Sequence, residues 1–293
     1  MIKKQQIQFI VNPFSGVGKK KKLKHLLNKY LDHSKFDYKI CQTKFGGHAK
    51  EITNEAIQKN YDIIVAVGGD GSVNEVSGAL IDTEKTLGII PAGSGNGFAA
   101  HLGISRQTKK AINYLNSAKP LRIDTCKLND RIYINVAGVG FPASVAYNIR
   151  KSRFRGFLGY FRTSLIESFK HQAQSYSIKI DGKEIKRDCF CIEIANASTF
   201  GYNMKIASNA SLTDGLLDVV IIKKAPKWRY LFSMWRFLNG TIHCSRLVET
   251  YSAKEVEIKA SKPCPVHVDG EGFQTNEVLK FSINPLSLNV LIN

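Results

Sequence analysis

A buried strand that ends in glycines is the feature that most constrains the fold of this chain. Residues Ile63 to Val67 are continuously apolar, and Gly68-Gly69-Asp70-Gly71 follows directly. An uninterrupted apolar run of this length is typical of a parallel strand that is covered on both faces. A parallel neighbour requires a crossover connection, usually a helix, so the run predicts alternating strands and helices around it.

The first 125 residues carry that alternation and predict a doubly wound α/β nucleotide-binding domain. The expected strands are Ile7–Val11, Tyr38–Thr43, Asp62–Val67 and Thr86–Ile90. The expected helices are Gly18–Leu31, Ala49–Lys59, Ser72–Leu80, Gly97–Leu102 and Lys109–Asn116. We expect the last run, Ser287–Asn293, to return to this domain, which then comprises residues 1–125 and 286–293.

After Leu121 the pattern changes to short strands separated by turns of Asn, Asp and Gly, with hairpin signals at Asn129-Asp130 and Asp181-Gly182. Two helical stretches, Ala143–Gln172 and Lys227–Leu238, interrupt the strands. The expected strands are Leu121–Leu128, Arg131–Val139, Tyr176–Ile180, Asp188–Ala195, Leu217–Lys223, Glu255–Ala260, Val266–Val268 and Val278–Ile283. This pattern predicts a mainly antiparallel β-sandwich domain over residues 126–285.

Composition indicates a basic protein of the cytoplasm. The formal net charge of +18 favours partners that bear phosphate, such as nucleotides, nucleic acid or anionic membranes, with a purely solubilising charge as the alternative. No stretch approaches the roughly 20 apolar residues of a membrane helix. The run Ile7–Val11 is too short for a signal peptide. The six cysteines lack CxxC spacing, which predicts reduced thiols.

Four glycine-containing loops follow the expected strands of the α/β domain. Ligands of open parallel sheets bind beyond the carboxyl ends of the strands. Glycines let backbone N–H groups approach phosphate oxygens, and a helix N-terminus nearby favours anions. The loops therefore predict a phosphate site. They are Asn12-Pro13-Phe14-Ser15-Gly16, Thr43 to His48, Gly68-Gly69-Asp70-Gly71-Ser72, and Gly93-Ser94-Gly95-Asn96-Gly97.

Asp70 is an acid in a loop that suits anions. A carboxylate repels phosphate unless a cation lies between them, so Asp70 indicates Mg²⁺, bound directly or through water. The alternative is a turn aspartate that caps the following helix. Asn96 suits a base, a ribose or the N-terminus of its own helix. No Walker pattern is present, and we expect the Lys19–Lys24 run to be a solvated helix face, with a phosphate or membrane role as the alternative.

The combination of motifs, in this order, resembles the diacylglycerol kinase catalytic-domain superfamily, which includes bacterial lipid kinases, sphingosine kinases and ceramide kinases. The resemblance covers nearly the whole chain. The motifs are Asn12-Pro13-x-Ser15-Gly16, Gly68-Gly69-Asp70-Gly71-Ser72-Val73-Asn74-Glu75-Val76, Gly88-Ile89-Ile90-Pro91-Ala92-Gly93-Ser94-Gly95-Asn96 and Asp269-Gly270-Glu271.

The resemblance implies a kinase that transfers the γ-phosphate of ATP to a lipid hydroxyl, with ATP in the cleft between two domains. It implies that Glu271 is the general base, with Asp269 nearby, and that Asp70 and Asp124 belong to the Mg²⁺–phosphate environment. Without the resemblance, a D-G-E turn is usually only a hairpin. The implied nucleotide contacts are Asn12, Thr43, Gly68, Gly69, Gly71, Asn74, Glu75, Gly93, Ser94, Gly95 and Asn96.

Asp214 and Asp218 resemble a segment that holds a structural Mg²⁺ in some bacterial members, with turn and strand-edge positions as the alternative. One stretch departs from the family pattern. Bacterial diacylglycerol kinases typically carry Asn-Asp-Phe-Ala-Arg where this chain has Asn96-Gly97-Phe98-Ala99-Ala100. The form Gly93-Ser94-Gly95-Asn96 is closer to sphingosine kinases, so the acceptor is expected to be diacylglycerol or a sphingoid-type lipid.

Basic and aromatic residues interleave in Arg150–Lys170 and in Lys223–Arg236. That pattern suits an amphipathic helix on an anionic bilayer, and a helix packed on the sandwich with its cations toward water is the alternative. We expect a lipid substrate, peripheral membrane association and no nucleic-acid partner. A homodimer through an exposed edge strand is left open.

Two other functions compete with the lipid kinase. An NAD kinase-like enzyme also uses a GGDG loop, but Asn12-Pro13-x-Ser15-Gly16 and Asp269-Gly270-Glu271 favour the lipid kinase. A non-catalytic binder of anionic membrane or nucleic acid would explain the positive charge. The acids Asp70, Asp124 and Glu271 argue against it, because an anion binder has no need of carboxylates in its site.

Overall fold

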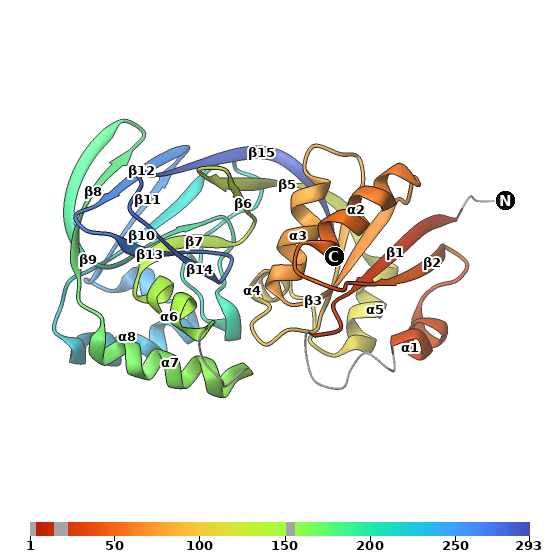
Figure 1. Cartoon of the computed structure of the whole chain (residues 1–293), viewed down its shortest axis with the longest axis horizontal. Coiled ribbons are helices and arrows are strands. Elements are labelled where there is room, and N and C mark those ends of the chain that lie inside the picture. The colour runs from red at the N-terminus through yellow and green to blue at the C-terminus, as the bar shows by residue number, and fades with distance from the viewer. Residues whose placement is uncertain (1–3, 15–22, 151–155) are drawn as a thin grey trace. The chain divides into compact units, whose positions relative to one another are not determined.

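The computed structural model describes residues 4–14, 23–150 and 156–293, and the chain divides into two compact units (Figure 1). The first unit consists of the residues up to Ile123 together with Leu286–Asn293, and the second unit is Asp124–Pro285. Strands β5 (Lys119–Leu128) and β15 (Leu279–Ile292) run along the chain from one unit into the other.

A parallel sheet forms the first unit, in the order β15-β4-β3-β1-β2. Besides the end of β15, its strands are β1 (Gln5–Val11), β2 (Phe36–Gln42), β3 (Ile63–Gly68) and β4 (Thr86–Pro91). Every residue of β3 and β4 is buried, as the apolar run predicts. Val11 is level with Val67, and Val67 with Ile90, so the loops after β1, β3 and β4 leave the same edge of the sheet.

Five helices accompany this sheet among the described residues: α1 (Leu23–Tyr30), α2 (His48–Gln58), α3 (Asp70–Leu80), α4 (Gly97–His101) and α5 (Thr108–Ser117). Helices α2 and α3 pack together on one face, and α1 and α5 pack together on the other (Figure 1). This arrangement confirms the doubly wound α/β prediction. Ser15, Gly16 and Lys19–Lys22 lie outside the described residues, so the structure gives no account of that part of the first loop or of the lysine run.

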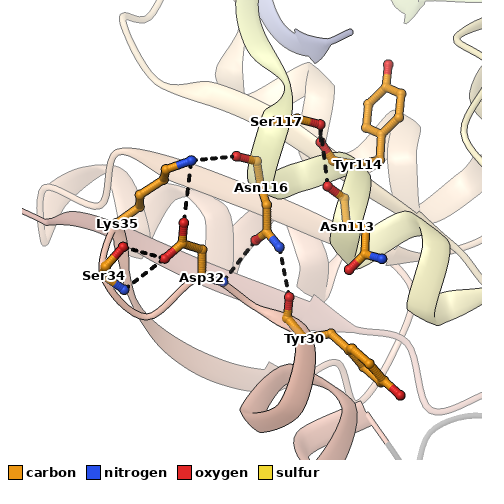
Figure 2. Close-up of polar contacts among 8 residues, drawn as sticks. All are labelled: Tyr30, Asp32, Ser34, Lys35, Asn113, Tyr114, Asn116 and Ser117. Carbon is orange, nitrogen blue, oxygen red and sulfur yellow. Dashed lines mark hydrogen bonds and ion pairs between the residues drawn. The ribbon is translucent and has the colours of Figure 1, made fainter.

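Asn116 fastens the end of α1 to the end of α5 (Figure 2). Its side chain accepts the backbone N–H of Asp32 at 3.0 Å and donates to the Tyr30 carbonyl at 2.8 Å. Lys35 donates to the Asn116 carbonyl at 3.2 Å and pairs with the Asp32 carboxylate at 3.4 Å. Lys35 immediately precedes β2, so this network lies at the amino ends of the strands and supports the scaffold rather than the carboxyl edge of the sheet.

The second unit is built from antiparallel strands. They are β5, β6 (Arg131–Tyr133), β7 (Val136–Gly140), β8 (Gln174–Ile180), β9 (Lys183–Ala195), β10 (Leu217–Lys223), β11 (Val248–Ala253), β12 (Glu255–Ala260), β13 (Cys264–Val268), β14 (Glu271–Thr275) and the first part of β15. The first half of β9 pairs with β8, and its second half pairs with both β7 and β10. One apolar core includes residues of β7, β8, β9, β10, β12, β13 and β15, and a second, smaller one includes residues of β7, β9 and β10. This confirms the predicted sandwich.

The helices of the second unit are α6 (Phe141–Ile149), α7 (Gly156–Lys170) and α8 (Lys227–Asn239), with short 3₁₀ turns η1 (Gly201–Asn203) and η2 (Ile242–Cys244). Helix α6 packs on β7, β13 and β14. Helices α7 and α8 lie side by side (Figure 1), and Lys227 donates to the Phe169 carbonyl at 2.6 Å. Within the described ranges, no helix combines the length and apolar character needed to cross a bilayer.

Four element predictions were wrong in detail. The single strand expected over Arg131–Val139 is two strands, β6 and β7. The single helix expected over Ala143–Gln172 is two helices, α6 and α7, and Gly156 opens α7 with a positive φ of 74° that a helix interior does not accommodate. The two strands expected at Val278–Ile283 and Ser287–Asn293 are one strand, β15. Strands β11 and β14 were not predicted.

Candidate functional site

Asn12 connects the loop after β1 to the loop after β3. Its backbone N–H donates to the Val67 carbonyl at 3.1 Å, and its side-chain amide donates to the Ser72 hydroxyl at 3.2 Å. Its side-chain oxygen accepts the backbone N–H of Phe14 at 2.8 Å. The predicted contact residue Asn12 is therefore oriented by the strand and helix that flank the Gly68–Gly71 run.

Glycines at two of these loops allow the backbones to touch. A Cβ on Gly69 would stand 3.3 Å from the Gly93 Cα, and a Cβ on Gly93 would overlap the Gly69 Cα. The Gly93 N–H also donates to the Gly68 carbonyl at 3.1 Å. Close packing of the β3–α3 loop on the β4–α4 loop therefore requires glycine at these positions, in addition to any role toward a phosphate.

Asp70 joins the same two loops through its side chain. Its Oδ2 accepts the backbone N–H of Asn96 at 2.8 Å. Burial raises the pKa of Asp70, and backbone N–H groups of Asn96, Gly97 and Phe98 oppose that rise. The carboxylate therefore lies at the start of α4 as well as in the first turn of α3. The capping alternative expects Asp70 to cap α3, the helix that follows it, whereas its side chain accepts backbone N–H groups at the start of α4, the next helix along the chain.

Asn96 holds the fourth loop in shape. It has a positive φ of 55°, its Oδ1 accepts the Gly93 N–H at 3.0 Å, and its Nδ2 donates to the Gly93 carbonyl at 2.7 Å. Asn tolerates this left-handed backbone better than most residues. Its side chain is buried, so the amide shapes the turn that carries Ser94 and Gly95.

Glu75 supports the second loop from a neighbouring helix. Its two carboxylate oxygens accept the N–H groups of Gly47 at 2.9 Å and Ala49 at 3.1 Å, at the N-terminus of α2. A carboxylate is favourable there because it meets unsatisfied N–H groups and the positive end of the helix. The predicted contact Thr43 precedes this loop and is buried, and Asn74 lies beside Glu75 on α3.

The same loop carries two aromatic residues, Phe45 and His48, that none of the sequence motifs includes. The rings of Phe45 and His48 stack with centroids 4.6 Å apart, and Phe45 is 56% exposed. The Lys44 N–H donates to His48 Nδ1 at 2.9 Å. The sequence signal that could have identified this pair is Phe45, an aromatic residue between Lys44 and Gly46 shortly after a strand.

Asp269 and Glu271, which flank Gly270, have different surroundings in the second unit. The buried Asp269 carboxylate accepts the N–H groups of Ile134 at 3.1 Å, Asn135 at 3.0 Å and Val136 at 3.1 Å. It therefore fixes the connection between β6 and β7. Glu271 is exposed at the start of β14 and is available to a substrate. The geometry gives Asp269 a positioning role and leaves Glu271 as the candidate base.

Asp124 connects with the Asp214–Asp218 segment inside the second unit. Its buried carboxylate accepts the Gly215 N–H at 2.8 Å. Burial, together with the charge of Asp214, raises the pKa of Asp218 to about 6. Within the described part of the chain, no three His, Cys, Asp or Glu side chains form a cluster that could hold a metal ion. Any cation here would depend on one or two carboxylates.

Comparison with known proteins finds a matching family model for each of the two units. Residues 6–128 match the family model for the diacylglycerol kinase catalytic domain, and residues 135–292 match the YegS C-terminal NAD kinase beta sandwich-like domain. The diacylglycerol kinase of Bacillus subtilis (strain 168) is 30% identical over 276 residues, which cover 91% of this chain and 90% of the relative. A probable lipid kinase YegS-like protein of Chromohalobacter salexigens is 28% identical, covering 77% of this chain and 75% of the relative.

A solved structure shares the fold. The crystal structure of a putative diacylglycerol kinase from Bacillus anthracis str. Sterne aligns with a TM-score of 0.79, covering 100% of this chain and 99% of that chain at 22% sequence identity.

Proposed function

The chain belongs to the diacylglycerol kinase catalytic-domain family and is an ATP-dependent lipid kinase, and on that premise we propose which of its residues carry the reaction. One observation carries the proposal: Asp70 and Asn96 join two glycine loops at the carboxyl edge of a parallel sheet. This is where phosphoryl groups bind in such sheets.

The nucleotide phosphates bind at these loops. Gly69, Gly71, Ser94 and Gly95 supply backbone N–H groups, and the N-terminus of α3 supplies a favourable field for anions. Asn12 and Asn96 fix the shapes of the flanking loops through the contacts described above. The remaining predicted contacts, Thr43, Asn74 and Glu75, line or support the neighbouring loop.

Asp70 fits a Mg²⁺ ion that accompanies ATP. Mg²⁺ in nucleotide sites is usually held by one or two carboxylates together with phosphate oxygens and water. Asp70 is a half-buried carboxylate between two loops suited to phosphate, and burial raises its pKa, which a nearby cation would counter. When bound, the ion would neutralise charge on the transferred phosphate. We assign Asp70 to this ion. The resemblance also implies a role for Asp124 in the Mg²⁺–phosphate environment, and we assign Asp214 with Asp218 to a separate structural Mg²⁺.

Glu271 receives the proton of the lipid hydroxyl. As the hydroxyl oxygen bonds to the γ-phosphorus, the bond from that phosphorus to the β–γ bridging oxygen breaks, and ADP leaves. The proton passes to the Glu271 carboxylate, which is exposed at the start of β14. Asp269 positions this turn, because its carboxylate is occupied by three backbone N–H groups.

The lipid is reached through an aromatic–basic surface on α7 and α8. Its exposed apolar members are Phe157, Leu158, Phe161, Leu165, Phe169, Trp228, Phe232, Trp235 and Leu238. Basic residues on the same helices include Arg162, Lys170, Lys227, Arg229 and Arg236. Soluble surfaces rarely expose this much contiguous apolar area without a partner. Apolar side chains beside cations suit an anionic bilayer, and we propose peripheral membrane association through this surface.

Transfer of labelled γ-phosphate to a total lipid extract tests the proposal. Wild type should label a lipid band in the presence of Mg²⁺, and Asp70→Ala should abolish it. Diacylglycerol and a sphingoid base are supplied in separate assays to identify the acceptor. Gly97 and Ala100 depart from the bacterial diacylglycerol kinase pattern, so the sequence does not decide between these two lipids. An NAD kinase-like function would be favoured over the lipid kinase by two results together. No lipid would be labelled across several extracts and metals, and NADP would be formed from NAD in a parallel assay.

A further inference from the structure

Helix α6 lies directly behind β14, the strand that begins with the proposed base Glu271. The next residue, Gly272, is buried, and a Cβ there would overlap the backbone nitrogen of Tyr147 in α6. Successive residues of a strand point to opposite faces. Position 272 therefore faces α6, and the Glu271 side chain points to the opposite face of the strand.

Strand β14 depends on this support because it lies at an edge. Among the described strands it pairs only with β13. An edge strand has ladder partners along one side only. Its position therefore depends more than that of an inner strand on the element that covers its face, and α6 is packed there.

Arg150 ties the end of α6 to the same strand. It directly follows the helix, and its Nη1 donates to the Gly272 carbonyl at 3.2 Å. A cation at a helix C-terminus is favourable toward the last carbonyls of its own helix, but this hydrogen bond crosses to β14. The acceptor belongs to the residue after Glu271, so the guanidinium restrains the backbone that carries the carboxylate.

The other end of α6 is fixed to the sandwich. Gly140 precedes the helix with a positive φ of 93°, and a Cβ there would overlap the carbonyl oxygen of Phe190 in β9. The Phe141 ring stacks on the Phe190 ring with centroids 4.9 Å apart, and the Ser144 hydroxyl donates to the Gly140 carbonyl at 3.1 Å. Helix α6 is therefore a fixed element against which Arg150 can hold β14.

Stability alone gives Arg150 little purpose. The residue is exposed, so water competes for its donors and a single hydrogen bond adds little to the free energy of unfolding. A general base, by contrast, must lie within hydrogen-bond reach of the proton that it takes. A displacement of about 1 Å can lower the rate about a hundredfold, so the contact matters more to phosphoryl transfer than to folding.

We propose that Arg150 is a positioning residue for the general base. Its guanidinium fixes the Gly272 carbonyl, and through that peptide it fixes the direction in which the Glu271 carboxylate meets the acceptor hydroxyl. The inference rests on the proposed function and deepens it, because it adds a residue that acts through the base.

Steady-state kinetics in neutral detergent micelles tests this role with the acceptor lipid that wild type labels. Neutral micelles remove the attraction of a cationic side chain to an anionic bilayer. Arg150→Gln should lower kcat about tenfold and leave KM for ATP unchanged. Arg150→Lys, which keeps a charged donor, should recover most of the loss. Unchanged kcat in folded Arg150→Gln protein would overturn the proposal.

Arg246→Gln is the matched control. It removes the same charge from an exposed position shortly before β11, and it should keep the wild-type kcat. An equal fall in kcat for Arg246→Gln would show that loss of charge alone lowers the rate, and the positioning role would be lost.

A double-mutant cycle shows whether Arg150 acts through Glu271. In the Glu271→Gln background, Arg150→Gln should lower kcat less than about twofold, because the base that it positions is already removed. A further tenfold fall would contradict the proposal, since Arg150 would then act independently of Glu271.

Hydrogen exchange separates this inference from the proposed function. Arg150→Gln should raise the exchange rates of the protected β14 amides about tenfold relative to those of β12. Equal exchange would overturn the positioning role, whatever the enzyme phosphorylates. If Glu271→Gln keeps the wild-type kcat, or if no lipid is labelled, the proposed base fails, and exchange still decides whether Arg150 holds β14.

Discussion

The Asp70 carboxylate accepts the backbone N–H of Asn96 at 2.8 Å. A residue of the loop after β3 therefore fixes the start of α4, the helix that follows the loop after β4. Shape and charge at this edge therefore depend on one side chain. Asp70→Asn keeps the size of the group and removes its charge. We expect kcat/KM for lipid phosphorylation to fall at least about a hundredfold, measured with labelled ATP. Asp82→Asn, a change at an exposed aspartate with a positive φ, should leave the rate unchanged.

Gly93→Ala tests whether loop-to-loop contact determines the site. The new Cβ would overlap the Gly69 Cα, so we expect a loss of about 2 kcal/mol or more in unfolding free energy and weaker ATP binding. Urea denaturation and fluorescent-nucleotide titration measure the two effects. Gly78→Ala is the matched control: its Cβ meets nothing within 4 Å on helix α3, and it should stabilise by about 0.5–1 kcal/mol. A Gly93→Ala protein as stable as wild type would refute the packing argument.

Asp269 and Glu271 should separate stability from catalysis. Asp269→Ala leaves three backbone N–H groups without their acceptor and should lower the unfolding free energy by about 2–4 kcal/mol. Glu271→Gln should leave the melting temperature unchanged and lower kcat about a hundredfold or more. Calorimetry and single-turnover phosphate transfer provide the readouts. Equal rates for Glu271→Gln and wild type would remove Glu271 as the general base.

The aromatic–basic surface predicts membrane binding that depends on charge. Arg229→Gln with Lys170→Gln should weaken binding to anionic vesicles by about 2 kcal/mol, since each surface cation contributes about 1 kcal/mol. Vesicle sedimentation at low and high salt measures the effect. Lys183→Gln with Lys186→Gln is the control, because it removes the same charge from the β8–β9 hairpin. This double change should leave binding to anionic vesicles as in wild type. Equal wild-type binding to neutral vesicles, unaffected by salt, would exclude the electrostatic component.

His171 predicts a loss of stability in mild acid. Burial lowers the pKa of His171 below its ordinary value of 6.5, against an opposing hydrogen bond to the Phe190 carbonyl at 2.9 Å. The unfolded chain therefore takes up a proton first, and stability that is complete above about pH 6.5 falls as the pH drops toward the folded pKa. His171→Gln should flatten this fall in urea denaturation between pH 7.5 and pH 5.5. His243→Gln, at an exposed histidine, should leave the fall as steep as in wild type.

The sequence predicted the parallel sheet and the glycine loops at its carboxyl edge because that information is local. The apolar run Ile63–Val67 and the glycines after it are contiguous, and the strand alternation that they predict is confirmed. The contact of Asp70 with the start of α4 could not be predicted from local sequence, because its partner Asn96 is brought near only by the pairing of β3 with β4. The positions assigned to nucleotide and metal are still predictions.

Long-range register accounts for most of what the sequence did not reveal. Glu193 of β9 and His267 of β13 are 74 positions apart, and their hydrogen bond depends on the alignment of both strands with Gly138 of β7. The continuity of β15 was hidden by Pro285, which in the sequence resembles a break between two strands. The division of α6 from α7 was hidden because aromatic and basic residues continue through both segments.

Strand β15 has a consequence for the order in which this protein folds during synthesis. Asn289 and Val290 pair with Thr86 and Leu87 of β4, and they follow the whole second unit along the chain. A ribosome therefore produces β4 long before its partner strand exists. Until the last residues emerge, one side of β4 presents unpaired backbone groups, which can recruit a neighbouring chain. We expect chaperone dependence of the nascent chain to end only when β15 has docked.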